Sequence, residues 1–157
     1  MLNDIGLLVL RVVSGGYMIS HGLPKLRDAD GEYAKSFESL GFHPGHLFVQ
    51  RAAVAEMAAG ALIALGAFGP LGPMLLLADM IVAATSVTLR EKRFKANQHE
   101  VEALYAVVAV LIALSGPGKF SADRALGITR FDPVWLRYLS LAAALGGAAV
   151  MLGGRNQ

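Results

Sequence analysis

The 157-residue chain contains no cysteine and few charges, and both shortages exclude whole classes of function. Without cysteine, the chain can form no disulfide, no thiolate metal site and no thiol–disulfide exchange of its own. The formal net charge is only +2, and the basic residues lie in separate loops instead of a stripe that would suit nucleic acid. A phosphate-binding loop, a GxGxxG fingerprint and a serine nucleophile motif are also missing, so the sequence does not support an NTPase, a Rossmann enzyme or a hydrolase.

Metal ligands are equally scarce. His43 and His46 are close together, but they lie in a turn with no third ligand nearby. His99 and Glu102 have the spacing of neighbours on a helix, yet they lack the second histidine of a zinc-protease motif. We therefore expect no metal site.

Apolar residues, in contrast, are abundant at 55% of the chain. A soluble protein of this size keeps much of its chain at the surface and has little interior for such an excess, whereas lipid accommodates it. We therefore expect an all-α integral membrane protein. The acidic flank before the first apolar stretch is not typical of a cleavable signal peptide.

Five stretches approach the roughly 20 mostly apolar residues that a membrane-crossing helix needs. The fourth is short, and the polar residues before it could add a turn. Prolines and glycines at 69–73 predict a tight hairpin between the second and third stretches, and the periodicity of 31–40 predicts a short surface helix. The five stretches cover residues 5–22, 47–68, 74–89, 101–115 and 134–153.

Lysine and arginine counts predict the orientation, because these residues accumulate in cytoplasmic loops. With five spans, the N-terminus, the 69–73 turn and the 119–133 connection share one side, which carries Lys119, Arg124 and Arg130. We expect that side to be external and the other to be cytoplasmic. The other side carries Lys25, Arg27, Lys35, Arg90, Lys92, Arg93, Lys95 and Arg155.

Arg11, Glu56 and Asp79 lie at membrane depth, where an ionisable group costs roughly 2.5–3.5 kcal/mol and tends to face a partner or a cavity. At 1.5 Å of rise per residue, Arg11 lies about 9 Å and Asp79 about 12 Å from the same membrane edge, so an Arg11–Asp79 pair is geometrically reasonable. Glu56 is also within possible reach of Arg11. This intramembrane network either fixes helix orientation or lets Glu56 relay a proton or meet a polar substrate.

A second polar set gathers toward the cytoplasmic ends of the spans. His21 and Lys25 end the first span, Arg51 lies one turn inside the second, and Glu102 opens the fourth. A pocket there, with hydrogen-bond donors, an imidazole and apolar walls, would suit a quinone headgroup. Alternatively, Lys25 and Arg51 reach lipid phosphates and His21 caps a helix end.

Three segments resemble motifs of the DoxX family. Residues 20–25 (SHGLPK) resemble its HG-x-x-K signature, and residues 116–123 (GPGKFSAD) resemble its GPG-[RK]-[FY]-S-x-D motif. Residues 55–66 resemble its E-x-x-G-G-x-x-L-x-x-G helix, with Ala-Gly in place of the paired glycines. The matching positions are His21, Gly22, Lys25, Glu56, Gly116, Gly118, Ser121 and Asp123.

The resemblance covers roughly residues 5–126 and implies a four-helix transmembrane bundle in a bacterial-type inner membrane. Residues 134–153 would add a fifth transmembrane helix within one domain over 1–157. Some family members resemble the membrane subunit of thiosulfate:quinone oxidoreductase, and others associate with redox or detoxification proteins. The resemblance therefore implies a membrane subunit of a quinone-linked oxidoreductase, with a redox protein or a second copy as partner.

A non-catalytic scaffold or a small-solute carrier is the alternative function. Within the family motifs, the resemblance implies that Gly116 and Gly118 serve a turn and that Asp123 caps or anchors the loop. His21, Lys25 and Glu56 are the matching positions whose chemistry could serve a quinone or a proton.

Overall fold

The computed structural model describes residues 2–128 and 133–155, and it is all-helical over these residues. Within these ranges, four helices are long and apolar enough to cross a membrane: α1 (Leu2–Arg27), α3 (Gly45–Leu65), α4 (Leu71–Glu91) and α7 (Val134–Gly153). The shorter elements are α2 (Glu32–Ser39), the 3-10 turn η1 (Ala96–Gln98), α5 (Glu100–Ser115) and α6 (Ala122–Ala125). The predicted all-α architecture is confirmed.

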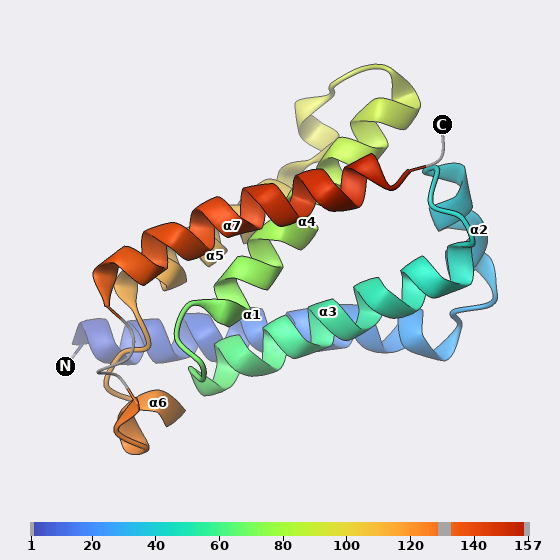
Figure 1. Ribbon diagram of the computed structural model, residues 1–157. Helices are drawn as coiled ribbons and strands as arrows, with labels where there is room; N and C mark the ends of the chain where they lie inside the picture. The colour runs from blue at the N-terminus through green and yellow to red at the C-terminus, as the bar shows by residue number, and fades with distance from the viewer. Residues whose placement is uncertain (1, 129–132, 156–157) are drawn as a thin grey trace.

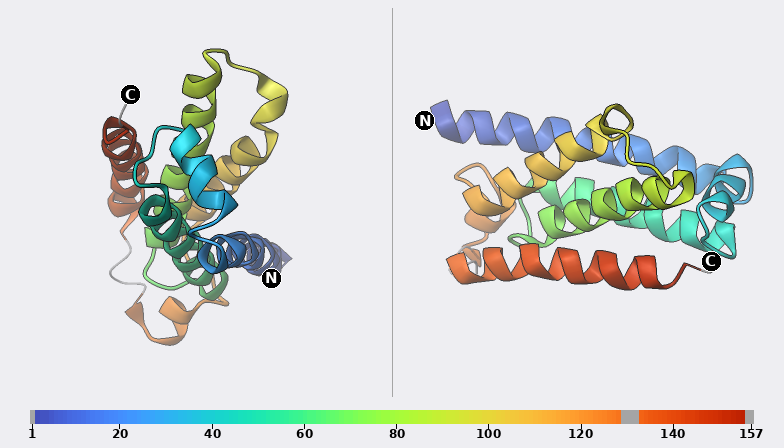
Figure 2. Two further views of the ribbon diagram at one scale, coloured as in Figure 1. Left: turned by 90° about the vertical axis from the view of Figure 1, so that its right-hand side faces the viewer. Right: turned by 90° about the horizontal axis from the view of Figure 1, so that it is seen from above.

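The helices run along a common axis, with α1 at one side of the bundle and α7 at the other (Figures 1 and 2). α1 packs on α3, and α4 lies in the middle against α3, α5 and α7. α2 crosses the end of the bundle where α1 finishes and α3 begins. The short surface helix expected within 31–40 and the hairpin expected at 69–73 are therefore both present.

The C-terminal segment predicted at 134–153 is a helix with the same bounds, and it is one of the four long helices. α5 has only 16 residues. At 1.5 Å per residue it is about 24 Å long, shorter than the roughly 30 Å hydrocarbon core. The stretch predicted as the fourth span is therefore α5, which packs against α4. It is shorter than the four helices that are long enough to cross a membrane. A separate turn, η1, precedes it.

Side-chain contacts show which connections and chain ends lie together at each end of the bundle. At one end, Lys119 Nζ lies 3.1 Å from Asp4 Oδ2, and Asp123 binds the turn between α3 and α4. At the other end, Arg155 Nε donates to Leu40 O at 2.6 Å. The start of the chain, the α3–α4 turn and the loop after α5 thus lie at one end, as expected if the chain runs along the bundle five times. Arg130, which was counted for orientation, lies outside the described residues.

α1 and α3 approach closely because glycines face each other across the seam. A Cβ on Gly15 would lie 2.4 Å from Gly60 O, and a Cβ on Gly60 would lie 2.5 Å from Gly15 O. One turn from the end of α1, a Cβ on Gly22 would lie 2.7 Å from Ala53 O. Small residues at such positions allow the backbone contact by which helices associate in lipid.

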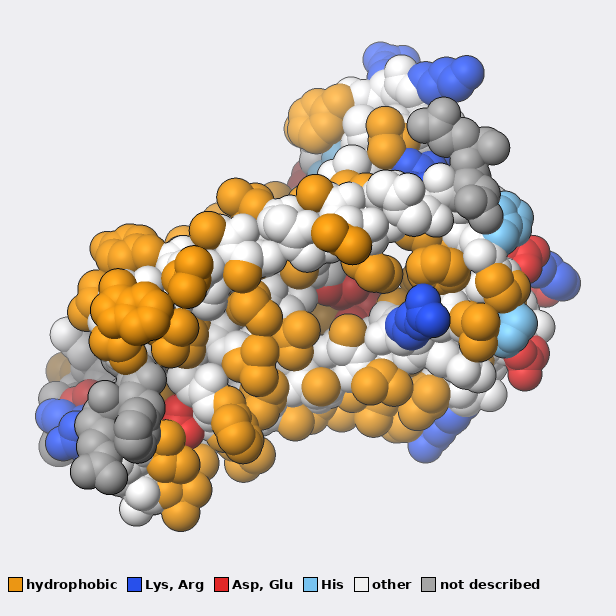
Figure 3. All heavy atoms as spheres, viewed as in Figure 1, with side chains coloured by type: hydrophobic (Ala, Val, Ile, Leu, Met, Phe, Trp, Pro, Cys, Tyr) orange, Lys and Arg blue, Asp and Glu red, His pale blue; other side chains and the backbone are white. Residues whose placement is uncertain are grey.

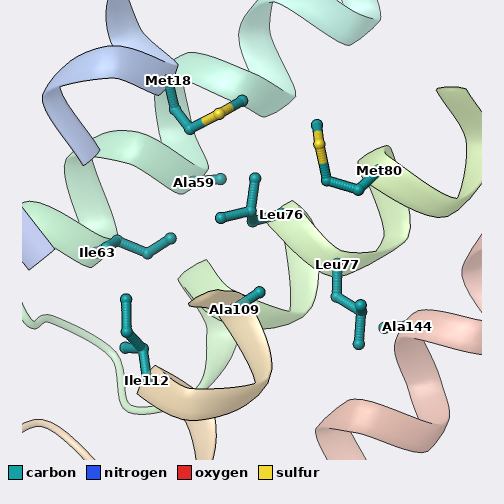
Figure 4. Close-up of a cluster of buried hydrophobic side chains, with 9 residues drawn as sticks. All are labelled: Met18, Ala59, Ile63, Leu76, Leu77, Met80, Ala109, Ile112 and Ala144. Atoms are coloured by element: carbon teal, nitrogen blue, oxygen red, sulfur yellow. The ribbon is translucent and has the colours of Figure 1, made fainter. Parts of the chain in front are cut away.

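The centre of the bundle is filled by apolar side chains from α1, α3, α4, α5 and α7 (Figure 4). Outside it, large apolar residues remain exposed, among them Val13 and Tyr17 on α1, Leu104 on α5, and Trp135 and Tyr138 on α7. Such a continuous apolar exterior needs lipid or another protein to cover it. The buried cluster comprises Met18, Ala59, Ile63, Leu76, Leu77, Met80, Ala109, Ile112 and Ala144.

Candidate functional site

Arg11 is 1% exposed and holds three parts of the chain together at the α3–α4 end. Its Nε donates to Ile63 O at 3.1 Å and its Nη2 to Ala64 O at 3.3 Å, both in the last turn of α3. The same guanidinium donates to Pro117 O and, at 2.7 Å, to Phe120 O in the loop after α5. A cation beside the unsatisfied carbonyls at a helix C-terminus is stabilising.

Asp123 completes this arrangement from α6. Its carboxylate accepts the backbone N–H groups of Phe68 at 2.9 Å and Gly69 at 2.6 Å. Ser121 Oγ caps α6 by accepting from Arg124 N at 3.2 Å. We call Arg11, Ser121 and Asp123 the end clasp, because their hydrogen bonds join α1, the α3–α4 turn and the 116–121 loop.

Glycines make room for the clasp. Gly66 ends α3 with φ +63°, and a Cβ there would lie 2.6 Å from Arg11 Cζ. Gly116 has φ +74°, and a Cβ there would lie 2.5 Å from the guanidinium of Arg137. Both positions combine a left-handed backbone with a close neighbour, which only glycine accommodates without strain.

A cavity of about 400 Å³ lies in the opposite half of the bundle. α7 packs on α4 and α5, whereas α3 packs on α1, α2 and α4, and the cavity is lined from both α3 and α7. Figure 3 shows the hollow on the side of the bundle, between α7 and α3, with acidic side chains at its base. The volume falls within the roughly 300–1,000 Å³ of small-molecule sites.

The cavity wall is mostly apolar, with three phenylalanine rings from α2, the α2–α3 connection and α3. Phe42 lies 6.0 Å from Phe37 and 5.1 Å from Phe48, between ring centroids. The Arg51 guanidinium stands 5.4 Å from the Phe48 centroid. Leu75, Val82, Val87, Ala148 and Met151 complete much of the remaining wall.

Several residues that line this apolar space carry buried polar atoms without hydrogen-bond partners. Among the described residues, four buried oxygens of the lining make no hydrogen bond: Glu56 Oε2, Asp79 Oδ2, Ser86 Oγ and Glu102 Oε2. Buried polar groups in native proteins are nearly always hydrogen-bonded, so this cluster is a polar region whose hydrogen-bonding capacity the described residues do not use. We call this space the acidic cavity. Its charged lining residues are Glu56, Asp79, Glu102, Lys25 and Arg51.

Lys25 is the cation that pairs with Glu56. Its Nζ donates to Glu56 Oε1, and the side chains are 22% and 4% exposed, respectively. The pair joins the end of α1 to the middle of α3, and the Gly22 contact keeps the two backbones close. Glu56 therefore has one oxygen engaged by Lys25 and one buried oxygen without a hydrogen-bond partner.

The structure changes the predicted partners in two ways. Depth in the membrane made a pair of Arg11 with Asp79 geometrically reasonable, with Glu56 also within reach, but the hydrogen bonds of Arg11 go to backbone carbonyls at the α3–α4 end. Asp79 instead lines the acidic cavity, as does Glu56. The equal-depth argument failed because it ignored the carbonyls exposed where α3 ends.

His21 also lies elsewhere. It was expected to converge with Arg51 and Glu102, but it is exposed and makes an edge-on contact with Tyr105, with 6.4 Å between ring centroids. Of the predicted quinone-site residues, Lys25, Arg51, Glu56 and Glu102 do line one cavity. Ser86 and the phenylalanine rings were missed, since nothing in the sequence distinguishes them from ordinary residues of a helix or connection.

The long apolar helices, the apolar exterior and the internal ion pair define a multi-pass membrane protein. Within that class, the DoxX family model matches residues 6–89, more than half of the chain, and the chain therefore belongs to the DoxX family. The match spans α1 to α4 and includes Gly22, Lys25, Glu56 and Asp79; residues 116–123 lie outside it. No curated protein and no solved structure matches the chain.

Proposed function

We propose that the acidic cavity binds the headgroup of a membrane quinone and that the protein is the membrane subunit of a quinone-linked oxidoreductase. The observation that carries the proposal is the side opening of the cavity between α3 and α7. A hollow between two spanning helices faces lipid, so a lipid-soluble ligand can enter it without crossing water. Its tail would extend along the apolar exterior.

The lining fits a quinone headgroup. Apolar and aromatic walls suit the ring, and a few polar groups within such walls fix orientation. Ser86 Oγ can donate to a carbonyl oxygen, as can the ammonium of Lys25 and the guanidinium of Arg51. A bound quinone would accept two electrons and two protons.

The electrons would come from a partner or a soluble substrate, because the chain has no cysteine, haem motif or flavin fingerprint. We infer a redox protein docked on the membrane surface, and its identification after pull-down from native membranes tests that inference. Recovery of the chain alone, or only as a homo-oligomer, would contradict it.

The excess of lysine and arginine in the loops at the α2 end supports an orientation in which this end, and with it the acidic cavity, lies toward the cytoplasm of a bacterial-type inner membrane. A reporter fused after Arg93 should give a cytoplasmic signal. An external signal there would reverse the orientation without affecting the cavity.

Calorimetric titration of quinone-depleted protein with a short-chain ubiquinone or menaquinone analogue tests the binding site. Wild type and the control Glu100→Gln, an exposed carboxylate on the same helix as Glu102, should bind equally. Glu102→Gln and Asp79→Asn should weaken binding by tenfold or more, because each changes a polar group that faces the cavity. Absence of binding by wild type, or equal binding by all four proteins, would reject the proposal.

A small-solute carrier is the second candidate, and the excess of carboxylates over cations at the cavity favours a cationic solute. Liposomes containing the protein should then take up a small organic amine when a pH gradient is imposed, and Glu102→Gln should reduce the uptake. Silent liposomes together with quinone binding would favour the first proposal.

A further inference from the structure

The connection between α4 and α5 carries the most basic segment of the chain, and this segment begins where a membrane-spanning helix ends. α4 finishes at Glu91, and residues 90–95 (REKRFK) hold four cations and one carboxylate. Figure 1 shows the connection projecting beyond the other helices, and Figure 3 shows Lys and Arg side chains at its tip. Arg90 Nη1 donates to Ser39 Oγ at 3.4 Å, so the segment belongs to the α2 end of the bundle. We call residues 90–95 the basic turn.

Two of the four cations have no partner within the described residues. Glu91 accepts from Lys95 Nζ at 2.9 Å and lies 3.7 Å from Arg90 Nη2, so the carboxylate of the basic turn is already engaged. Lys92 and Arg93 are exposed, and their side chains make no ion pair, hydrogen bond or ring contact there. Among the described lysines and arginines, this is otherwise true only of Arg27 and Arg124, which stand singly.

Phe94 places an apolar ring next to the two unpaired cations. It is 68% exposed, and its ring stacks on that of His99, with 5.4 Å between centroids and 22° between planes. His99 is itself buried, and its Nε2 lies 3.0 Å from Thr88 Oγ1 in α4. Phe94 is therefore held against the end of α4 while most of its surface remains uncovered.

Unpaired cations directly after a membrane-spanning helix attract acidic lipid headgroups. An exposed aromatic ring beside them suits the boundary between headgroups and acyl chains. A soluble anion, or an acidic protein surface, would match the cations but leave the ring uncovered, whereas a lipid matches both. We propose that the basic turn binds an acidic phospholipid, with Lys92 and Arg93 at its phosphate and Phe94 against its first acyl carbons. This surface lies outside the lining of the acidic cavity and does not depend on quinone.

Native mass spectrometry of the purified protein in a neutral detergent, titrated with phosphatidylglycerol or phosphatidylcholine, measures the dissociation constant of each lipid. Wild type should bind phosphatidylglycerol about tenfold more tightly than the net-neutral phosphatidylcholine. Lys92→Gln/Arg93→Gln should lose this preference, because no unpaired cation then remains in the basic turn. The matched control Arg27→Gln/Arg124→Gln removes the same charge from the other two unpaired cations and should retain the preference.

Phe94→Ser tests the apolar half of the surface. It should weaken the binding of both lipids severalfold, because the ring contacts acyl carbons that the two lipids share. Phe120→Ser, an exposed phenylalanine at the opposite end of the bundle, should leave both affinities unchanged. Equal effects of the two substitutions would remove Phe94 from the surface and overturn the proposal.

Equal affinity of wild type for the two lipids would also overturn the proposal, as would an equal loss in both double variants, since net charge alone would then explain the preference. Displacement of phosphatidylglycerol by the same concentration of inorganic phosphate would assign the cations to a soluble anion instead. An unchanged lipid preference in Lys92→Gln/Arg93→Gln, with loss of a co-purifying protein, would assign the basic turn to that protein. If circular dichroism shows that this double variant does not fold, Lys92→Gln and Arg93→Gln are measured singly, and each should reduce the preference.

Discussion

Arg11 and Glu56 are both almost wholly buried, at 1% and 4% exposure, yet their surroundings differ. Arg11 donates to four backbone carbonyls, and Asp123 beside it accepts two backbone N–H groups. Glu56 has one oxygen paired and one unmatched, and Asp79, Ser86 and Glu102 around it also have unmatched oxygens. The hydrogen-bonding groups of the end clasp are therefore matched within the chain, whereas the acidic cavity has hydrogen-bonding capacity that the described residues do not use.

Arg11→Met tests the end clasp and should give the largest loss of stability. It removes the guanidinium that donates to four carbonyls, and a buried polar group left without a partner costs about 1–3 kcal/mol, so several such losses together should give the largest effect. Chemical unfolding in detergent measures the loss. The matched control is Arg51→Met, an exposed arginine at the cavity, which should change stability by about 0.5 kcal/mol or less. A similar loss of stability in both variants would show that the end clasp does not stabilise the fold more than an exposed arginine does.

Asp123→Asn tests the other half of the clasp. One oxygen remains to accept an N–H group, but the new amide points hydrogens at the second, leaving a buried donor unmatched at a cost of about 1–3 kcal/mol. The same unfolding experiment reports it. Unchanged stability would mean that the bonds to Phe68 and Gly69 contribute nothing.

Gly60→Ala should separate α1 from α3, the two helices that carry Arg11 and the Lys25–Glu56 pair. The new Cβ would lie 2.5 Å from Gly15 O, and relieving such a clash costs about 1–3 kcal/mol. Gly16→Ala is the control, because nothing lies within 4 Å of its added Cβ. If both variants unfold alike, close packing at the seam does not explain the glycine.

Glu102→Gln should have the smallest effect on stability, within about 1 kcal/mol and of either sign. Its buried oxygen has no partner to lose, and neutralising a charge near apolar walls offsets what is lost. Glu100→Gln provides the comparison. A loss as large as that of Asp123→Asn would show that the cavity, too, is a structural network.

Hydropathy and the Gly-Pro turns predicted the helices of this bundle well, because the length of an apolar run follows from the bilayer itself. α1 continued past the expected end at Gly22 to Arg27, since Pro24 lies in the last turn, where it removes only one hydrogen bond. The sequence also identified Lys25, Arg51, Glu56 and Glu102, because charges in apolar helices are conspicuous. The hydrogen-bond partners of these side chains could not be predicted. Arg11, for example, donates to backbone carbonyls, which every residue has.

The central claim is that the acidic cavity binds ligand and the end clasp does not. Thermal unfolding with and without a quinone analogue tests it in wild type, Asp123→Asn and Asp79→Asn, because a ligand raises Tm only where it binds the folded state. The account predicts that the analogue raises the Tm of wild type and of Asp123→Asn by the same amount and leaves Asp79→Asn nearly unchanged. Equal shifts in all three proteins, or no shift in wild type, would contradict it.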